Sequence, residues 1–404
     1  MVGSDTDVVA AWAASGAMAL TGRPDGPPLG PPARLVPGLR DAADAIAADS
    51  AGIGRPVALD PLALLGERAA LRGLRSGGDV SCGGNARLLR TTDDWVAVSL
   101  ARSDDIDLVP AWLELPGPPA DPWAAVASGL STLDAETAVE RGRLLGLPVA
   151  RLGEVRDDSP VPVQRVGESG PCASTESVTV VDLSALWAGP LCASVLQLAG
   201  ARVVKVESLA RPDGLRRGDP ALFDLLNAGK QNVCMDLREP SGLSDLRRLL
   251  AAADVVIESS RPRALEQWGI RAAEVLAGSP RLRVWLSITG YGRSDPERNW
   301  VAFGDDAAVA GGLVAWDGDA PCFCADAVAD PATGLVAAAA CLSALRGGGR
   351  WLIDVAMARV AASLSGPTIP SSDAVACAPP RSRPARGPAR PLGVDTVPVL
   401  STVD

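Results

Sequence analysis

Residues 177–207 read SVTVVDLSALWAGPLCASVLQLAGARVVKVE, and their pattern is the strongest indication of the fold. Ser177 to Leu183 is short and rich in β-branched residues, which predicts a buried strand. The apolar run from Pro190 to Leu198 predicts a helix that Gly200 ends, and Arg202 to Glu207 predicts a second strand. A strand, a helix and a strand within about 30 residues make the unit that joins parallel strands through a crossover helix.

The same alternation continues along the chain. Residues 253–259 (ADVVIES) and 282–287 (LRVWLS) predict further buried strands between helical patterns. We therefore expect an α/β fold with a Rossmann-like parallel sheet, covered by helices on both faces. Residues 156–176 are rich in Pro, Ser, Gly and charge, which predicts a linker. Residues 367–404 contain the Pro/Arg-rich run PPRSRPARGPARP, which predicts a disordered tail.

Histidine is absent from all 404 residues. Its absence excludes Ser-His-Asp and Cys-His nucleophile systems, HExxH metal sites and histidine pH switches. Any catalysis must rest on carboxylates, Cys, Ser or Thr, Arg, one Tyr and two Lys. A net charge of −10 and an aromatic content of 3% argue against nucleic acid and an anionic membrane as partners.

The sequence also bears on compartment and metal content. The N-terminus lacks the basic-then-apolar pattern of a signal peptide, and the longest apolar runs reach about half of a membrane span. The eight cysteines include no CxxC pair, so neither a zinc site nor a thioredoxin-type site is supported. We expect reduced thiols, no metal site and a cytoplasmic protein.

Residues 8–39 and 304–335 form an internal repeat without gaps. Three glycine pairs stand 296 positions apart: Gly16 and Gly312, Gly22 and Gly318, Gly38 and Gly334. The repeat places Arg34 of the first copy opposite Asp330 of the second copy.

Five segments occur in order between residues 178 and 364: VVDLSALWAGPLCASVLQLAGARVVKVES, NAGKQNVCMDL, ADVVIESSRPRALEQWGI, LSITGYGRSDP and VADPATGLVAAAACLSAL. Together they resemble the first half of the family III CoA-transferases of the CaiB/BaiF type. GRPDGPP, SCGGNARLLR and TTDDWVAVSLA resemble, more weakly, that family's second half. The resemblance implies permuted halves, with a smaller domain and a partial repeat in residues 1–155 and a CoA-binding domain in residues 177–366.

The resemblance implies a Rossmann-like domain with a second, smaller α+β domain, and a homodimer. It also implies an acyl-CoA:carboxylate CoA-transferase that works through an aspartyl-CoA thioester. Coenzyme A would enter as the acyl-CoA substrate, a carboxylic acid would be the acceptor, and no cofactor would be tightly bound.

Asp330 matches the catalytic aspartate of that family. Local sequence alone favours another role, because Asp followed by Pro331 is typical of a helix N-cap and its first turn. The two roles are compatible. A carboxylate that is ionised at pH 7 needs no base to act as a nucleophile, which suits a chain without histidine.

Gly83 and Gly84 resemble the glycine loop that closes over the aspartyl intermediate in that family, and an ordinary turn is the alternative. The resemblance also implies CoA contacts from seven residues that follow the predicted strands. Taken singly, each is more often a solvated surface group than a ligand, but together they lie where α/β sheets bind nucleotides. These residues are Arg216, Arg217, Asn227, Lys230, Ser259, Ser260 and Arg261.

Three other functions stay open. The permuted order, Arg34 in the first copy and a lysine missing near residues 299–301 permit a catalytically inactive CoA-binding or assembly protein. An acyl-CoA racemase is disfavoured, because Asp305 matches the histidine of that branch of the family. An NAD-dependent oxidoreductase is disfavoured, because the turn LWAGPL lacks the GxGxxG pattern.

Overall fold

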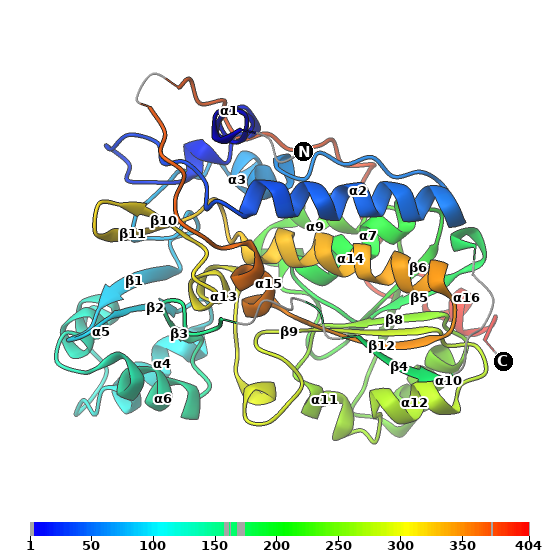
Figure 1. Cartoon of the computed structure of the whole chain (residues 1–404). Coiled ribbons are helices and arrows are strands. Elements are labelled where there is room, and N and C mark those ends of the chain that lie inside the picture. The colour runs from blue at the N-terminus through cyan, green and yellow to red at the C-terminus, as the bar shows by residue number, and fades with distance from the viewer. Residues whose placement is uncertain (1–3, 157–160, 162, 168–173, 373–374, 404) are drawn as a thin grey trace.

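The computed structural model describes residues 4–156, 161, 163–167, 174–372 and 375–403. Its centre is a seven-stranded sheet in the order β4-β12-β9-β8-β5-β6-β7 (Figure 1). Six of these strands are parallel, and β4 runs antiparallel to β12 at one edge. The strands are β4 (Val163–Gly167), β5 (Thr179–Asp182), β6 (Arg202–Ser208), β7 (Gln231–Met235), β8 (Val255–Glu258), β9 (Val284–Thr289) and β12 (Arg350–Ala356).

The strand–helix–strand unit predicted from residues 177–207 is present as β5, α7 (Ala188–Leu198) and β6. Gly200 follows the helix with φ of 115°, a conformation that side chains with a Cβ rarely adopt. β5 and β6 are direct parallel neighbours, and the other two predicted strands are β8 and β9. The prediction of an α/β fold with a parallel sheet is confirmed.

Helices cover both faces of the sheet because its strands bury alternate side chains on opposite sides. Val180 and Val203 lie in a core under the helices of one face, whereas Val181 and Val204 lie in a second core on the other face. On the first face, α14 packs against both α2 and α7, as Figure 1 shows. The helices are α2 (Leu35–Ile53), α9 (Pro220–Asn227) and α14 (Ala329–Gly347) on the first face, and α10 (Pro240–Ala251), α11 (Pro262–Glu266) and α12 (Ala272–Gly278) on the second.

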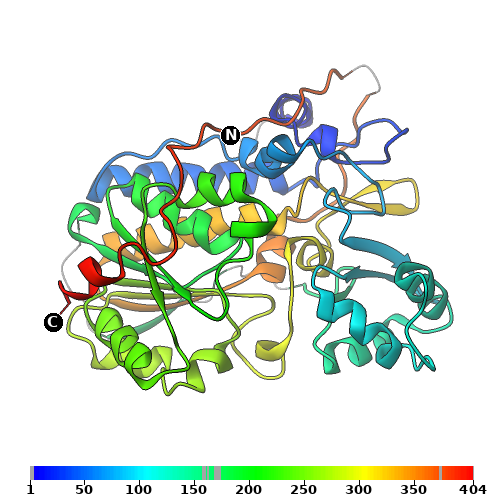
Figure 2. The same ribbon diagram turned by 180° about the vertical axis from the view of Figure 1, so that it is seen from behind.

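A smaller unit stands beside the large sheet (Figure 2). It is built on the antiparallel sheet β1-β2-β3, and Val96, Val109 and Trp112 are among the residues of its own core. Its elements are β1 (Ala86–Arg90), β2 (Trp95–Ser99), β3 (Val149–Arg151), α4 (Ser103–Trp112), α5 (Pro122–Leu130) and α6 (Ala135–Leu144).

The region predicted as one domain over residues 1–155 is divided between these two units. Leu39 and Ile46 of α2 are fully buried in the same core as Leu342 of α14. The apolar face of α2 therefore belongs to the large unit, and only the part of the region from β1 onward builds the smaller one. The first part also contains α1 (Asp5–Ser15), η1 (Met18–Leu20), η2 (Ala63–Gly66) and α3 (Glu67–Arg72).

Part of the predicted linker is a strand. β4 lies within residues 156–176 and pairs with β12, while residues 157–160, 162 and 168–173 lie outside the described residues. The edge of the parallel sheet supplies unpaired backbone groups, and β4 satisfies them.

The structure also differs from the predicted disorder of the tail. The Ala378 N–H donates to the Ala13 carbonyl over 2.9 Å, and Arg390 pairs with Asp395 over 2.6 Å. Asp395 accepts in turn from the Asn232 N–H of β7 over 2.8 Å. The tail is ordered by distant partners on the folded body, which its own composition does not show. It ends in α16 (Thr396–Leu400).

The described residues form seven further elements. They are η3 (Thr175–Ser177), α8 (Leu215–Gly218), η4 (Glu297–Asn299), α13 (Gly304–Ala310), β10 (Val314–Asp317), β11 (Ala320–Phe323) and α15 (Met357–Leu364). No helix within the described residues combines the length and apolar character that a membrane crossing needs.

The internal repeat has a structural counterpart. Gly16 and Gly312 both have a left-handed backbone, with φ of 89° and 72°. Gly22 and Gly318 are left-handed as well, with φ of 106° and 60°. The third glycine pair lies inside the two long helices, α2 and α14. The matched sequence positions therefore have matched backbone conformations.

Candidate active site

Asp330 lies at the start of α14, but not as its N-cap. The N-cap is Val328, so Asp330 is inside the first turn and its N–H donates to the Ala327 carbonyl over 2.8 Å. Ala325 and Ala327 have φ of 52° and 45°, a strained conformation for residues with a Cβ. This strained turn sets the direction in which α14 begins, and with it the position of the Asp330 side chain.

The Asp330 carboxylate faces the backbone of Gly304, the first residue of α13. The Gly304 amide hydrogen-bonds to the carboxylate. A Cβ at position 304 would lie 2.5 Å from the Ala327 carbonyl oxygen and closer still to Oδ2 of Asp330. Only glycine therefore lets α13 approach the carboxylate so closely.

Two further carboxylates and one guanidinium surround Asp330. Asp326 is fully buried and pairs with both Nε (2.9 Å) and Nη2 of Arg68, a residue of α3. Arg68 also stacks over Trp187 at 5.3 Å. Asp305, from α13, is electrostatically coupled to Arg68 and to Asp326.

Burial dominates the titration of this cluster. It raises the pKa of Asp330 to about 7, although Arg68 acts in the opposite direction. Burial likewise raises the pKa of Asp305 to about 6, again against the influence of Arg68. A pKa near 7 differs from the full ionisation at pH 7 that the sequence predicts, because the burial of Asp330 is not visible in its local sequence.

Asp330 opens into a cavity of about 630 Å³ at the carboxyl ends of the central strands. Leu183 after β5, Ser259 after β8 and Gly290 after β9 all line it, which is where open α/β sheets bind ligands. The N-terminus of α7 contributes Ala188 to the wall. The cavity therefore connects the carboxylate to the ligand-binding edge of the sheet.

Arginines gather along this cavity. Arg261 is among them, and burial lowers its pKa, with further lowering from Arg263, Arg102 and Arg211. Two of the lining arginines have carboxylate partners, since Arg102 pairs with Asp105 and Arg298 with Glu266. A lining with so many cations favours the binding of an anion, and in particular of a phosphate, which arginine can bind through two parallel hydrogen bonds. The lining arginines are Arg102, Arg211, Arg261, Arg263 and Arg298.

The structure brings some of the predicted site residues together. Ser259, Ser260 and Arg261 line the same cavity as Asp330, as the resemblance implies for a site that spans CoA. Ser259 Oγ also accepts from the Ala185 N–H over 3.1 Å.

Four other predicted residues lie away from this cavity. Arg216 pairs with Glu207 over 2.6 Å, and Arg217 is exposed on α8. Asn227 and Lys230 are buried and hydrogen-bond to each other over 3.0 Å. Lys230 also pairs with the buried Asp182. Three of these four polar groups are therefore satisfied within the protein.

The predicted glycine loop approaches the charge cluster and not the cavity. Gly83 and Gly84 are exposed, and the Gly84 N–H donates to the Ser81 carbonyl over 2.8 Å. A Cβ at Gly83 would lie 3.3 Å from Nη2 of Arg68. The side chain of Ser81 hydrogen-bonds to Asp305.

Sequence reasoning missed Arg68, Arg102 and Arg211. Arg68 and Arg102 come from the N-terminal region, and nothing in their local pattern marks them as neighbours of residues 200 or more positions away. Arg263 carried a signal, since it stands two residues after Arg261 in the segment SSRPRA.

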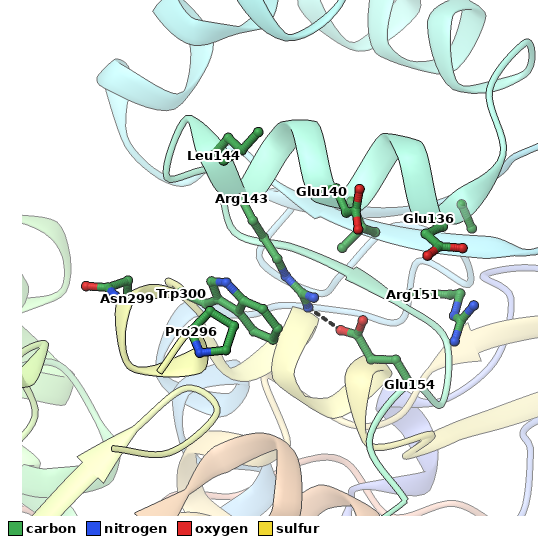
Figure 3. A pocket seen from close by; sticks show the side chains of 11 residues that line it. Glu136, Glu140, Arg143, Leu144, Arg151, Glu154, Pro296, Asn299 and Trp300 are labelled. Carbon is green, nitrogen blue, oxygen red and sulfur yellow. Dashed lines mark hydrogen bonds and ion pairs between the residues drawn. The ribbon is translucent and has the colours of Figure 1, made fainter. Parts of the chain in front are cut away.

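A second cavity, of about 720 Å³, lies between α6 and the segment around η4 (Figure 3). Arg143 stacks over Trp300 at 3.9 Å and pairs with Glu154, and Glu136 and Glu140 also line the space. It holds none of the predicted site residues. Trp300 lines both this cavity and the Asp330 cavity.

The model of CoA-transferase family III matches residues 176–394, more than half of the chain. The chain belongs to CoA-transferase family III. Its match includes Asp330, Gly304 and the strands that line the cavity, whereas Arg68 and Arg102 lie outside it.

Individual CoA-transferases of known name are similar over shorter stretches. The succinyl-CoA–D-citramalate CoA-transferase of Chloroflexus aurantiacus is 33% identical over 150 residues, which are 35% of this chain and 37% of that enzyme. The succinate–glutarate CoA-transferase of Agrobacterium fabrum is 30% identical over 200 residues, 45% of this chain and 50% of the relative. A solved CAIB/BAIF family protein from Brucella suis is 31% identical, with a TM-score of 0.43, over 48% of this chain and 55% of its own. The chain spans about a third to a half of the curated relatives it matches.

Proposed function

We propose that this family III member is an acyl-CoA:carboxylate CoA-transferase with Asp330 as its nucleophile. The observation that carries the proposal is one cavity with the Asp330 carboxylate at one part of its wall and a group of arginines at another. An acyl-CoA needs both, because its thioester must meet a nucleophile while its phosphates meet cations. The relatives named above are CoA-transferases, which supports the same reaction class.

The reaction runs in four balanced steps. A carboxylate oxygen of Asp330 attacks the thioester carbonyl, and CoA leaves as a thiolate, giving a mixed anhydride. The thiolate then attacks the Asp330 carbonyl carbon and releases the donor acid as a carboxylate. The acceptor carboxylate attacks the aspartyl-CoA thioester and expels the thiolate again. The thiolate finally attacks the acceptor carbonyl, which releases the new acyl-CoA and restores Asp330.

The residues of the cavity divide the work of binding. Ser259, Ser260 and Arg261, which follow β8, hold the nucleotide end of coenzyme A, and Arg211 and Arg263 add positive charge for its phosphates. The Gly304 amide holds the Asp330 carboxylate in place. The thiolate needs no proton at any step, so the absence of histidine is no obstacle.

A trapping experiment tests the proposal. The protein is incubated with a panel of acyl-CoA thioesters that includes succinyl-CoA, then with hydroxylamine, and digested for mass spectrometry. We expect a hydroxamate on Asp330, because hydroxylamine cleaves both the anhydride and the aspartyl thioester. Absence of the adduct across the panel, together with turnover in Asp330→Asn, would overturn the proposal. CoA binding by both proteins with neither adduct nor turnover would establish a CoA-binding protein instead.

A further inference from the structure

Arg68 is the guanidinium that pairs with Asp326 within the carboxylate cluster around Asp330, and it comes from outside the part of the chain that the family model matches. It sits on α3, a short helix of the N-terminal region, and is separated from Asp326 by 258 positions in the sequence. The comparisons therefore assign it no role, and the four steps of the reaction do not use it.

The geometry fixes Arg68 in one orientation. Its Nε and Nη2 both bond to Asp326, a side chain with no exposed surface, and its guanidinium stacks over Trp187. Two parallel bonds to a carboxylate hold a guanidinium in a defined plane. Gly83 lies near the other side of the group, since a Cβ there would lie 3.3 Å from Nη2. Asp326 therefore acts as the clamp that aims Arg68.

Several carboxylates act electrostatically on Arg68. Burial opposes its charge, but Asp326 and then Asp305 and Asp330 raise the pKa of its guanidinium above the ordinary value. The titratable groups that face it are thus Asp305 from α13, Asp326 from the turn before α14, Asp330 from α14 and Cys82 from the loop before β1. Three carboxylates share this one guanidinium among the groups that the structure describes here.

The reaction changes the charge of this cluster. Asp330 is an anion before the first step and a neutral anhydride or thioester afterwards. A fixed cation nearby favours the ionised carboxylate and so supplies the nucleophile. Without it, the three neighbouring carboxylates would repel one another, and the one that opens to the cavity would retain its proton at neutral pH.

We propose that Arg68, clamped by Asp326, is a positioning residue that keeps the Asp330 carboxylate ionised for attack on the thioester. The inference rests on the proposed function for its catalytic meaning. Its electrostatic part concerns the protein without substrate and is measurable separately.

The decisive variants are Arg68→Gln and Arg68→Lys. We call the fall of kcat/KM toward low pH, as Asp330 becomes protonated, the acid limb. In Arg68→Gln this acid limb should move to higher pH by about one unit or more, because a nearby opposite charge shifts the pKa of a carboxyl by that amount. Adduct formation on Asp330 should fall about fivefold or more at pH 7 and return toward the wild-type rate at pH 9. Arg68→Lys retains the charge and should keep the acid limb within about half a unit of the wild type.

Arg72→Gln is the matched control. Arg72 lies on the same helix and bonds to the Gly218 carbonyl over 2.8 Å, away from the three carboxylates. Its variant should leave the pH profile unchanged, and CoA affinity should be unchanged in every variant. A merely structural role of Arg68 would lower activity equally at all pH values and would not be rescued by lysine.

Arg68→Gln leaves the buried Asp326 without its partner, so the double variant Arg68→Gln/Asp326→Asn provides a neutral pair in case the single variant does not fold. The effect of Arg68 on the pKa of Asp330 is larger than the effect of Asp326 on the same pKa. The acid limb of the double variant should therefore still move to higher pH, but by less than in Arg68→Gln. Carbon-13 NMR of labelled aspartate, with Asp330→Asn to assign the signal, follows the same titration without turnover. An unshifted Asp330 titration in both variants overturns the inference, whereas a shifted titration with no Asp330 adduct in the wild type overturns only the proposed function.

Discussion

The two long helices α2 and α14 lie side by side, yet opposite charges stand at the matched repeat position near their starts. Asp330 opens into a cavity and has a strained turn before it. Arg34 instead donates to the carbonyls of Ser365 (2.7 Å) and Ala362 (2.9 Å) at the end of α15. The same scaffold thus holds one charge ready for a ligand and uses the other to cap a neighbouring helix. The surroundings of a charge decide its use more than the helix that carries it.

The largest effect should come from Asp330→Asn, which keeps the shape of the side chain but removes the nucleophile. Turnover should fall at least about a thousandfold, because no covalent intermediate can form. CoA affinity should stay within about tenfold, or roughly 1.4 kcal/mol, because the carboxylate acts on the acyl group. Steady-state kinetics and calorimetric titration with CoA check the two parts. Wild-type turnover in this variant would show that Asp330 at the start of α14 has no more part in the reaction than Arg34 at the start of α2.

Gly304→Ala should have the next largest effect. The new methyl group would meet Oδ2 of Asp330 and the Ala327 carbonyl, so the carboxylate must move. A misplacement of this size costs about a hundredfold in kcat, while KM for the acyl-CoA should change little. Gly347→Ala is the control, since no atom lies within 4 Å of a Cβ there. Equal kcat in the two variants would show that the α13 amide does not position the nucleophile.

The pH dependence of stability should distinguish the two helix starts by a smaller amount. The pKa of Asp330 rises on folding from 3.8 to about 7, so this carboxyl disfavours the folded state above pH 4, and its cost is complete above pH 7. Asp330→Asn should therefore have an unfolding free energy about 2 kcal/mol higher than that of the wild type at pH 8, a gain that is limited because the side chain is partly open to solvent. At pH 4 the two proteins should differ little. Urea unfolding at both pH values measures the difference. A variant that gains as much at pH 4 contradicts the linkage.

Arg34→Gln should have the smallest effect. It loses hydrogen bonds to two carbonyls at the end of α15, which should cost about 1–2 kcal/mol of unfolding free energy. Because Arg34 does not line the Asp330 cavity, kcat should remain unchanged. Thermal unfolding and kinetics of the same preparation test both statements. A loss of activity without a loss of stability would assign Arg34 a part in the reaction.

The sequence predicts the fold well where structure is local. The alternation in residues 177–207 predicts β5, α7 and β6, because a crossover unit carries its own strand, helix and stop signals. It predicts the tail and the first domain boundary poorly, because both depend on distant partners. Arg390 meets Asp395 beside β7, and the apolar face of α2 meets α14, contacts that no window of neighbouring residues contains.

The candidate site divides in the same way. Asp330, Ser259, Ser260 and Arg261 follow strands or begin a helix, so their sequence positions predict where they lie. The ionisation of Asp330 could not be predicted, because it depends on burial and on a guanidinium from another part of the chain. Asn227 and Lys230 show the opposite case, since polar residues after a strand can equally well satisfy each other in the interior.

The helix that carries Arg68 has a consequence for the order of events during synthesis. Its neighbour Glu67 is buried and pairs with Arg383 of the tail, and Arg68 pairs with Asp326. Neither ion pair can form until its C-terminal member has been synthesised. Because chains are translated at about 5–20 residues per second, the nascent protein carries Glu67 and Arg68 without these partners for about ten seconds or more. The ion pair that orients the guanidinium beside the reactive carboxylate is thus completed only late in synthesis.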